Sequence, residues 1–220
     1  MSAAPGAADP ASEARLSVVA HYEEALRRFG PTARGMDWKD ESSQRLRFAV
    51  LCDVCDLRGR SLHDLGAGAG HLYDFLRERG LDVEYSGSDL SPAMVEAARR
   101  RHPGVRFECL DRLGDFPAPT WDVVVCSGLF HVKLGCPDAQ WREFVEETLR
   151  RMYAACRVAI AFNLLTDLVD WRAPDLFYSD PGETLAFCRR ELSRRVALRH
   201  DYPLHEYTTY VYRPTAAEPG

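Results

Sequence analysis

The sequence predicts an α/β fold, a mostly parallel sheet with helices on both faces, and two observations indicate it. Between residues 61 and 165, short runs with the apolar spacing of strands alternate with runs that have the spacing of helices. Such alternation is typical of parallel strands joined by right-handed crossovers. The end of the chain differs, because the apolar runs 195–202 and 207–213 are separated by only four residues. So short a link makes a hairpin, and we therefore expect seven strands with an antiparallel pair at the C-terminus.

The segment before this alternation is expected to be helical. Residues 13–29 carry apolar side chains at helical intervals and are followed by Gly30-Pro31, which stops a helix. Residues 42–57 repeat the pattern, and the loop between the two runs holds Met36 and Trp38. The chain is thus expected to divide into a loose tail (1–11), an N-terminal helical lid (12–60), the main domain (61–213) and a second loose tail (214–220).

The elements of the main domain follow from the same patterns. We expect strands at 61–65, 83–88, 105–110, 122–126, 157–165, 195–202 and 207–213. We expect helices at 71–79, 91–101, 138–153 and 183–191. Ser91 and Pro92 suit the cap and the first turn of the second of these helices. The three consecutive valines within 122–126 predict a strand buried on both faces.

Composition narrows the function classes. The chain has 220 residues, of which 46% are hydrophobic, and 28 Lys and Arg against 33 Asp and Glu give a net charge of −5. This acidic balance disfavours nucleic acid as a partner, and no run of about 18 apolar residues predicts a membrane span. Seven cysteines and an N-terminus without a secretion pattern predict reduced thiols in the cytoplasm. Cys52 and Cys55 are interpreted as buried thiols, and no metal is expected.

The most informative segment runs from Leu62 to His71. A strand leads directly into three glycines spaced two apart, Gly66, Gly68 and Gly70, and a helix follows. Glycines let the backbone turn sharply and leave no side chain in the way of a ligand. The segment therefore predicts a ligand-binding turn at the carboxyl end of the first strand.

Two acidic residues indicate what kind of ligand the turn binds. Asp89 ends the next strand, where a carboxylate can accept two hydrogen bonds from a ribose diol. Dinucleotide folds favour G-x-G-x-x-G, whereas this loop reads G-x-G-x-G, with Asp64 two residues ahead of it. A carboxylate at that place repels a diphosphate and suits a ligand that carries an ammonium group. The pattern therefore predicts a pocket for a nucleoside with a cationic group.

The D-x-G-x-G-x-G loop followed by Ser-Asp-Leu-Ser resembles the class I S-adenosylmethionine-dependent methyltransferases, over about residues 42–165. The resemblance implies a Rossmann-like sheet and S-adenosyl-L-methionine as the cofactor. It implies that Asp64 holds the methionine amino group, that Asp89 binds the ribose hydroxyls and that Leu90 packs on the adenine ring. Asp111 matches the position that accepts a hydrogen bond from the adenine amino group. The expected cofactor-binding residues are Asp64, Gly66, Gly68, Gly70, Asp89, Leu90, Asp111 and Cys126.

The segment after the fourth strand, in this family, forms the floor beside the reactive methyl group. Here it runs from Cys126 to Lys133 and lacks the signatures of enzymes that methylate nucleobases. His131 is the candidate general base, because a neutral imidazole takes up a proton near pH 7. The candidate substrate-binding residues are Tyr22, Trp38, Lys133, Tyr178 and His200. For Trp38 an alternative is that it only anchors the two N-terminal helices, and for His200 that it only stabilises the hairpin.

The sequence therefore predicts a methyltransferase that acts on oxygen or nitrogen of a small-molecule acceptor, as a monomer or homodimer and without a nucleic-acid or membrane partner. Two alternatives stay open. One is a non-catalytic module that binds a nucleoside or a partner protein on the same fold, because Cys126-Ser127 stands where catalytic signatures are found. The other, an NAD(P)-linked oxidoreductase, is disfavoured by the glycine spacing.

Overall fold

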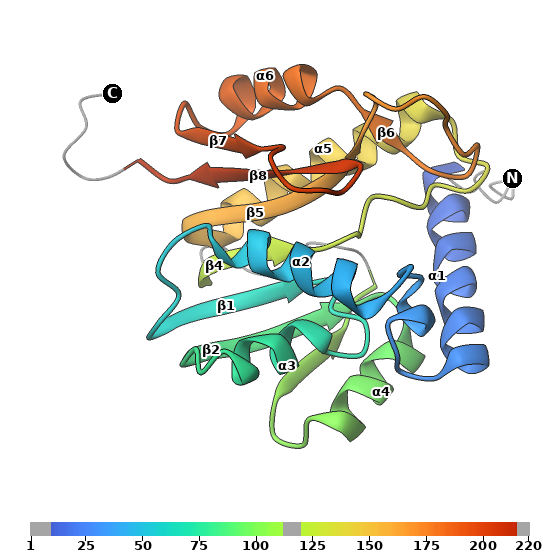
Figure 1. The fold of residues 1–220 in the computed structure, drawn as a ribbon, viewed down its shortest axis with the longest axis vertical. Coiled ribbons are helices and arrows are strands. Elements are labelled where there is room, and N and C mark those ends of the chain that lie inside the picture. The colour runs from blue at the N-terminus through green and yellow to red at the C-terminus, as the bar shows by residue number, and fades with distance from the viewer. Residues whose placement is uncertain (1–9, 112–119, 215–220) are drawn as a thin grey trace, which may run out of the picture.

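The computed structural model describes residues 10–111 and 120–214. In these residues eight strands form one sheet: β1 (Arg60–Leu65), β2 (Val83–Asp89), β3 (Arg106–Cys109), β4 (Trp121–Cys126), β5 (Cys156–Thr166), β6 (Tyr178–Ser179), β7 (Val196–Arg199) and β8 (Glu206–Tyr212). Seven of them follow the order β3-β2-β1-β4-β5-β8-β7 (Figure 1). The tails expected at the two ends lie almost wholly outside the described residues.

The sheet is parallel from β3 to β5 and antiparallel at its C-terminal edge. β8 pairs antiparallel with both β5 and β7, which confirms the predicted hairpin. The short β6 was not predicted, and it pairs parallel with the end of β5 at Leu165 and Thr166. Because β8 occupies the other side of β5 at Leu165, β6 lies on the side of β4, beyond the end of that strand.

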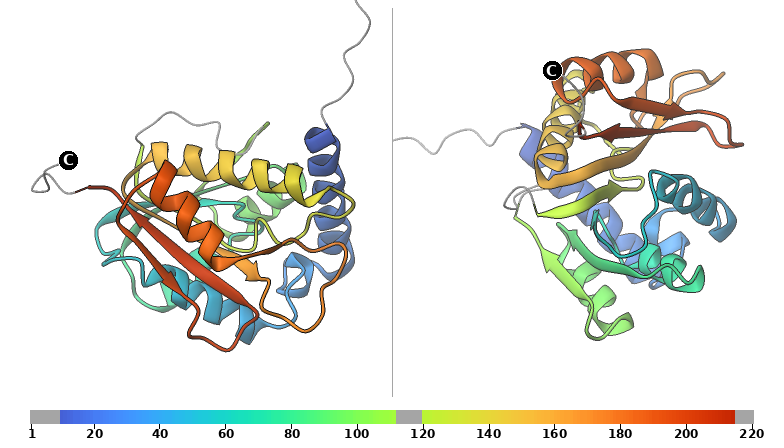
Figure 2. Two further views of the ribbon diagram at one scale, coloured as in Figure 1. Left: turned by 90° about the horizontal axis from the view of Figure 1, so that it is seen from above. Right: turned by 90° about the vertical axis from the view of Figure 1, so that its left-hand side faces the viewer.

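The helices in the described part of the chain are α1 (Pro10–Phe29), α2 (Glu41–Cys52), α3 (His71–Glu78), α4 (Pro92–Arg101), α5 (Asp138–Ala155) and α6 (Pro181–Glu191), with a 3₁₀ turn η1 (Arg34–Met36). α2, α3 and α4 cover one face of the sheet, and α5 and α6 cover the other (Figure 2). α1 stands across the edge at which the parallel strands end (Figure 1). This edge is where parallel α/β sheets bind their ligands.

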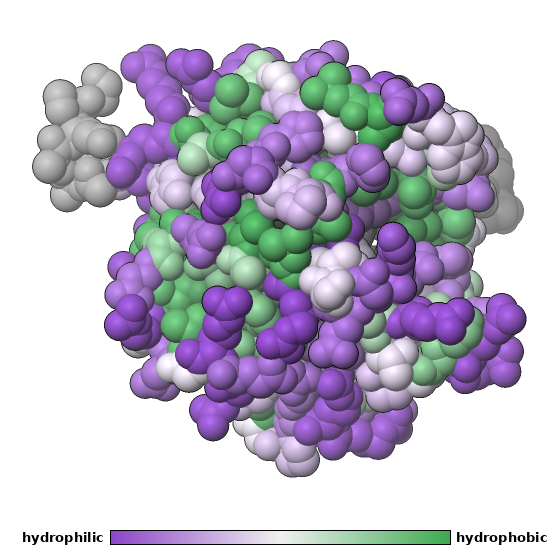
Figure 3. Space-filling model, in the orientation of Figure 1, coloured by the Kyte–Doolittle hydropathy of each residue, from purple (hydrophilic) through white to green (hydrophobic). Residues whose placement is uncertain are grey.

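Each face of the sheet has its own hydrophobic core. The core under α5 and α6 includes Ile160 and Phe162, and the core under α2, α3 and α4 includes Ala159 and Ala161. This alternation is the period of two that a strand buried on both faces requires. β4 follows it as predicted, since Val123, Val124 and Val125 are at most 1% exposed. The surface over α3 and α4 is mostly hydrophilic (Figure 3).

Two elements end at least three residues before the predicted end. α2 ends at Cys52 and not at residue 57, although Val54 and Leu57 are still buried. Val54 and Leu57 are apolar because they are buried in the turn after α2, and their helix-like spacing does not require a helix. β7 ends at Arg199 and not at residue 202, because the chain turns back and the Tyr202 hydroxyl lies 2.8 Å from that of Thr208.

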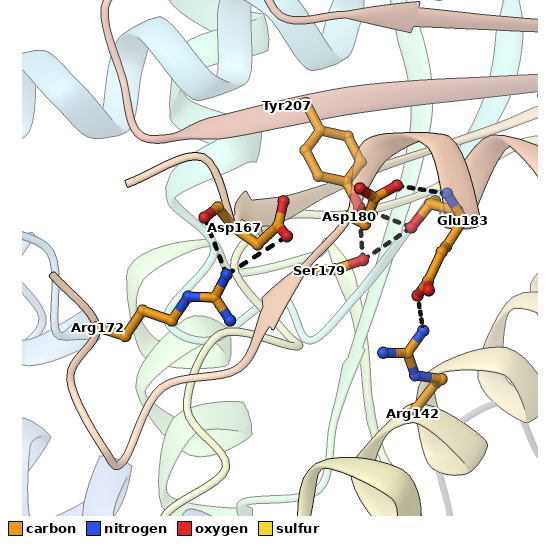
Figure 4. A network of polar contacts seen from close by, with 8 residues as sticks. Arg142, Asp167, Arg172, Ser179, Asp180, Glu183 and Tyr207 are labelled. Carbon is orange, nitrogen blue, oxygen red and sulfur yellow. Dashed lines mark hydrogen bonds and ion pairs between the residues drawn. The ribbon is translucent and has the colours of Figure 1, made fainter. Parts of the chain in front are cut away.

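The junction of β6 and α6 shows why these elements form where they do (Figure 4). The Ser179 hydroxyl lies 2.8 Å from the Tyr207 hydroxyl of β8, which holds β6 against the sheet. The Asp180 carboxylate accepts a hydrogen bond of 2.7 Å from the Glu183 backbone N–H, so that it caps α6. Arg142 of α5 forms an ion pair with Glu183. The helix predicted at 183–191 therefore begins two residues earlier, at Pro181.

Two further findings concern sequence predictions. Cys52 and Cys55 are half-buried and form no disulfide, and burial raises the pKa of the Cys52 thiol to about 12. Among the helices of the described residues, none combines the length and the apolar character that crossing a bilayer demands. The division of the chain at residue 60 stays a prediction.

Candidate cofactor and acceptor site

A cavity that opens to solvent lies at the carboxyl ends of β1 and β2. Its walls come from α1, η1, α2, the loops after β1 and β2, and the segment that follows β4. The predicted residues that line it are Tyr22, Trp38, Asp64, Gly66, Gly68, Asp89 and Leu90. Segments that are far apart in the sequence therefore meet at this edge of the sheet.

The glycine loop is fixed to the end of β2 by backbone hydrogen bonds. The N–H groups of Gly66 and Ala67 donate to the Ser88 carbonyl over 2.8 and 3.0 Å. The Gly68 N–H donates to the Asp89 carboxylate over 2.9 Å. Gly68 has a φ of +53°, and a Cβ there would lie 2.8 Å from the Met36 sulfur. Only glycine combines this backbone conformation with such a close approach.

Asp89 is positioned by its own strand end and by α4. One carboxylate oxygen accepts from Gly68 N–H and the other from Ser91 N–H, each over 2.9 Å. Burial raises the pKa of this carboxyl. The carboxylate also lines the cavity, where it can accept hydrogen bonds from a ligand diol. Tyr22 of α1 lines the same cavity, and burial, followed by the charges of Asp37 and Asp89, raises its pKa.

Asp64 lies deeper and lacks a cationic partner. It is 4% exposed, and its carboxylate accepts a hydrogen bond of 2.8 Å from the Tyr85 hydroxyl of β2. Burial raises the pKa of Asp64 to about 7, although the Tyr85 bond acts in the opposite direction. No salt bridge to Asp64 forms within the described residues. A buried carboxylate without a cation is costly, and a ligand ammonium group would relieve that cost.

These residues fit an adenosyl sulfonium compound that carries an amino acid group. The cavity offers one carboxylate suited to a diol and one suited to an ammonium group. Its other walls include apolar side chains that can pack on a purine, among them Val18, Leu90 and Met94. The fit thus rests on the types of groups present and on the unpaired acid, Asp64.

Three of the predicted cofactor-binding residues are not among those that line the cavity. Gly70 caps α3 and faces the core, where a Cβ would lie 2.8 Å from His102 and 2.9 Å from Phe107. Asp111 is exposed and borders residues 112–119, which lie outside the described part. Cys126 is fully buried in the core under α5. Direct contact of these three with the cofactor stays a prediction.

Three of the predicted substrate-binding residues have other partners. Lys133 lies 3.3 Å from the Asp138 carboxylate and donates to the Cys136 carbonyl. The Tyr178 hydroxyl accepts a hydrogen bond from the Ala173 N–H. His200 makes an edge contact with Tyr207, with ring centroids 6.1 Å apart. None of the three lines the cavity, and the hairpin interpretation of His200 agrees with its contact on β8.

Trp38 and His131 mark the other end of the site. Trp38 lines the cavity, and the His131 ring lies edge-on behind it at a centroid distance of 6.1 Å. His131 is 7% exposed, and burial lowers its pKa to about 4. The imidazole is therefore neutral at pH 7. Its Nε2 atom has no hydrogen-bond partner in the described chain, so it is free to accept a proton.

Several residues of the site were missed from the sequence. The sequence around Tyr85 indicates only a strand, yet the Tyr85 hydroxyl donates a hydrogen bond to the Asp64 carboxylate. Gln44 and Phe48 of α2 line the cavity, and their spacing of four on a helix was a usable signal. Arg47 and Glu206 form a buried ion pair, with 2.6 Å between Nε and the carboxylate. No local pattern connects two residues that are 159 positions apart.

Comparison with known proteins gives the same result as the geometry. Residues 63–157 match the family described as "Methyltransferase domain". A protein of Mycobacterium tuberculosis, "Putative methyltransferase Rv1506c", is 42% identical over 156 residues, which are 69% of this chain and 92% of that protein. A trans-aconitate 2-methyltransferase of Methylobacterium nodulans is 28% identical over 186 residues, which are 70% of this chain and 71% of the enzyme.

A solved structure shares the fold. The magnesium protoporphyrin IX methyltransferase of Synechocystis, crystallised with bound S-adenosylmethionine, superimposes with a TM-score of 0.66. The match covers 96% of this chain and all of that one at 14% identity, which indicates a common fold. The chain thus belongs to the class I S-adenosylmethionine-dependent methyltransferases, with S-adenosylmethionine as its cofactor. This result sets aside the oxidoreductase and the non-catalytic module.

Proposed function

We propose that this methyltransferase transfers a methyl group to an oxygen or nitrogen atom of a small-molecule acceptor. The observation that carries the proposal is the wall that Trp38, with His131 against it, forms in the cavity. Trp38 lines the cavity, and the His131 imidazole, buried and neutral, lies against the Trp38 ring. A wall of this kind suits a small acceptor better than a polymer.

The residues of the chain have distinct tasks in this proposal. Asp89 binds the ribose hydroxyls, and Asp64 holds the amino group of the methionine part. The bare backbone at Gly68 lets the cofactor approach the loop closely. When bound, the cofactor supplies a methyl group that is already activated by a positive sulfur. The protein therefore needs mainly to align the acceptor with it and to exclude water.

The lid and the base complete the proposed mechanism. α1 closes the cavity through Val18, Val19 and Tyr22, and its Glu23 accepts a hydrogen bond of 2.7 Å from the Ser91 hydroxyl of α4. This bond holds the lid on the body of the protein. His131 receives the proton of the acceptor at Nε2, the ring nitrogen that has no partner. A cytoplasmic location and a monomeric or homodimeric state belong to the same proposal.

The test is to incubate the enzyme with S-adenosylmethionine labelled in the methyl group. Separate reactions contain a deproteinised metabolite extract, nucleic acid, or denatured protein, and trans-aconitate is included because a relative carries its name. We expect label in small organic molecules only. Label in nucleic acid or protein, with none in the metabolite fraction, would contradict the proposal. A His131→Asn variant separates base catalysis, which lowers kcat, from cofactor binding, which should be unchanged.

A further inference from the structure

Behind Trp38 lies a buried polar group of four residues, Arg47, His131, Asn163 and Glu206, which we call the Arg47 cluster. Arg47 Nε donates to one Glu206 oxygen over 2.6 Å, and the Asn163 side-chain amide donates to the other over 2.9 Å. The Asn163 side-chain oxygen accepts from the Gly128 N–H over 2.8 Å. Glu206 is 0% exposed. Its two oxygens are thus both occupied by donors from within the protein.

Two buried atoms of the Arg47 cluster remain without a partner. Arg47 Nη1 and His131 Nε2 make no hydrogen bond to any described residue. The Asn163 backbone also interacts with the His131 ring and raises its pKa, against the larger effect of burial. Unsatisfied buried polar groups are rare in native proteins because each costs free energy. Together the two atoms offer one strong donor and, in the tautomer of His131 that is protonated at Nδ1, one acceptor.

Trp38 lines the cavity and also contacts both Arg47 and His131. The Trp38 ring covers Gly128 so closely that a Cβ there would overlap it. The Arg47 guanidinium carbon lies 4.4 Å from the centre of the same ring, and His131 meets its edge. Trp38 belongs to the short connection between η1 and α2, so it can turn aside without unfolding a helix. That movement would open the cavity onto Arg47 and His131.

We propose that Arg47 binds an oxyanion group of the acceptor, in the space that Trp38 now fills. In the same space, His131 accepts the proton of a neighbouring hydroxyl or amine of the acceptor. The inference rests on the proposed function and names its substrate class. An anion is favoured over a cation because Glu206, the one acid of the cluster, already accepts a hydrogen bond at each of its oxygens and is not free to pair with a ligand cation. A guanidinium matches the geometry of carboxylate and phosphate, which share this chemistry.

The test measures the binding of probe anions to the protein saturated with S-adenosylhomocysteine, by calorimetry. The probes are glycolate, malate and salicylate, each with its uncharged amide, and 2-hydroxyphenyl phosphate. We expect at least one hydroxycarboxylate or the phosphate to bind ten-fold or more tightly than the uncharged amide. Preference between the carboxylates and the phosphate identifies the source of the oxyanion. Binding of the amides as tight as that of the acids overturns the inference, as does binding of no anion.

The matched variants identify the residue responsible. Arg47→Met combined with Glu206→Met removes the pair without leaving a buried charge, and we expect it to abolish the preference for the anion. Arg45→Met, on the same helix but half-exposed and paired with Glu78, should leave it unchanged. Arg47→Lys keeps the charge and should weaken anion binding about ten-fold if the double variant does not fold. Anion binding within two-fold of wild type in these Arg47 variants overturns the inference.

The two proposals fail in distinguishable ways. If S-adenosylhomocysteine does not bind, the proposed function fails, and the anion titration is then made on the free protein. If it binds equally well to wild type and to the Arg47 variants while anions show no preference, only the inference about the acceptor fails.

Discussion

The two ends of the site differ in the kind of partner that is missing for a buried charged group. At the ends of β1 and β2 the cavity is open, and no cation among the described residues pairs with the buried carboxylate of Asp64. Beyond Trp38 the Arg47 cluster is closed, and a buried guanidinium nitrogen finds no acceptor in residues 10–111 and 120–214. Each end is therefore incomplete in a way that its expected ligand corrects: an ammonium group at the first, an oxyanion at the second. Under the two proposals, the site brings a cationic donor and an anionic acceptor together.

The two ends also differ in how they are built. The two acids and the glycine loop of the cofactor end lie within residues 64–89, from the end of β1 through α3 to the end of β2, so that short-range geometry fixes them. The acceptor end joins Trp38 and α2 to β5 and β8, at opposite ends of the chain. We therefore expect variants at the acceptor end to affect folding more strongly, and variants at the cofactor end to affect binding.

The largest effect is expected for Glu206→Ala. The substitution leaves the Arg47 guanidinium buried without its partner, and we expect the free energy of unfolding to fall by about 3–5 kcal/mol. Urea denaturation measures it. Adding Arg47→Met should restore much of the loss, because the unpaired charge is then gone. The distinction between the two ends fails if Glu206→Ala is as stable as wild type.

Asp89→Ala is expected to have the largest effect on binding. It removes two charge-assisted hydrogen bonds to the ribose, so the affinity for S-adenosylhomocysteine should fall by a factor of about 100 or more. Calorimetric titration measures this. Glu84→Ala is the control, since Glu84 lies on the same strand and is exposed. Equal affinity of Asp89→Ala and wild type would show that the ligand binds elsewhere.

The pH dependence of cofactor affinity tests Asp64. Its pKa of about 7 means that the charged form needed for an ammonium group develops as the pH rises through 7. The affinity for S-adenosylhomocysteine should therefore rise about eight-fold from pH 6 to pH 7.5. In Asp64→Asn this rise should be absent. The free energy of unfolding should change in the opposite direction. Between about pH 4 and pH 7 the native state keeps the Asp64 proton, whereas the unfolded chain loses it. The contribution of Asp64 to stability therefore falls as the pH rises through that range.

The smallest effect is expected for Tyr85→Phe. The Tyr85 hydroxyl stabilises the charged form of Asp64, and its loss should raise the pKa of that carboxyl further. The midpoint of the pH profile should move upward by about half a unit to one unit, which corresponds to one hydrogen bond of about 1 kcal/mol. Tyr73→Phe, on the neighbouring ring, is the control. An unmoved midpoint would mean that Tyr85 only packs.

The sequence was sufficient for the sheet and for most of the cofactor end. Alternating periodicity and the close C-terminal pair of strands predicted the topology. The loop from Gly66 to Gly68 was predictable because its backbone conformation requires glycine. It was not sufficient for β6, a two-residue strand whose pairing with β5 depends on tertiary contacts. The ends of α2 and β7 were also missed, because Val54 and Tyr202 are buried without belonging to a regular element.

The acceptor end could not be predicted because no single residue in it is distinctive. Arg47 and Glu206 are ordinary helix and strand residues until the fold brings them together over 159 positions. His131 was identified from its place after β4, but its burial and its free Nε2 depend on Trp38, Asn163 and the packing around them. Long-range pairs of this kind have no local signature.

A crystal structure of the protein with S-adenosylhomocysteine would decide whether the two acids act on one ligand. We predict both ribose hydroxyls within hydrogen-bond distance of the Asp89 carboxylate, the ligand amino group near Asp64, and the sulfur directed toward Trp38. A nucleoside bound away from Asp89, or an amino group directed away from Asp64, would contradict the assignment of the site.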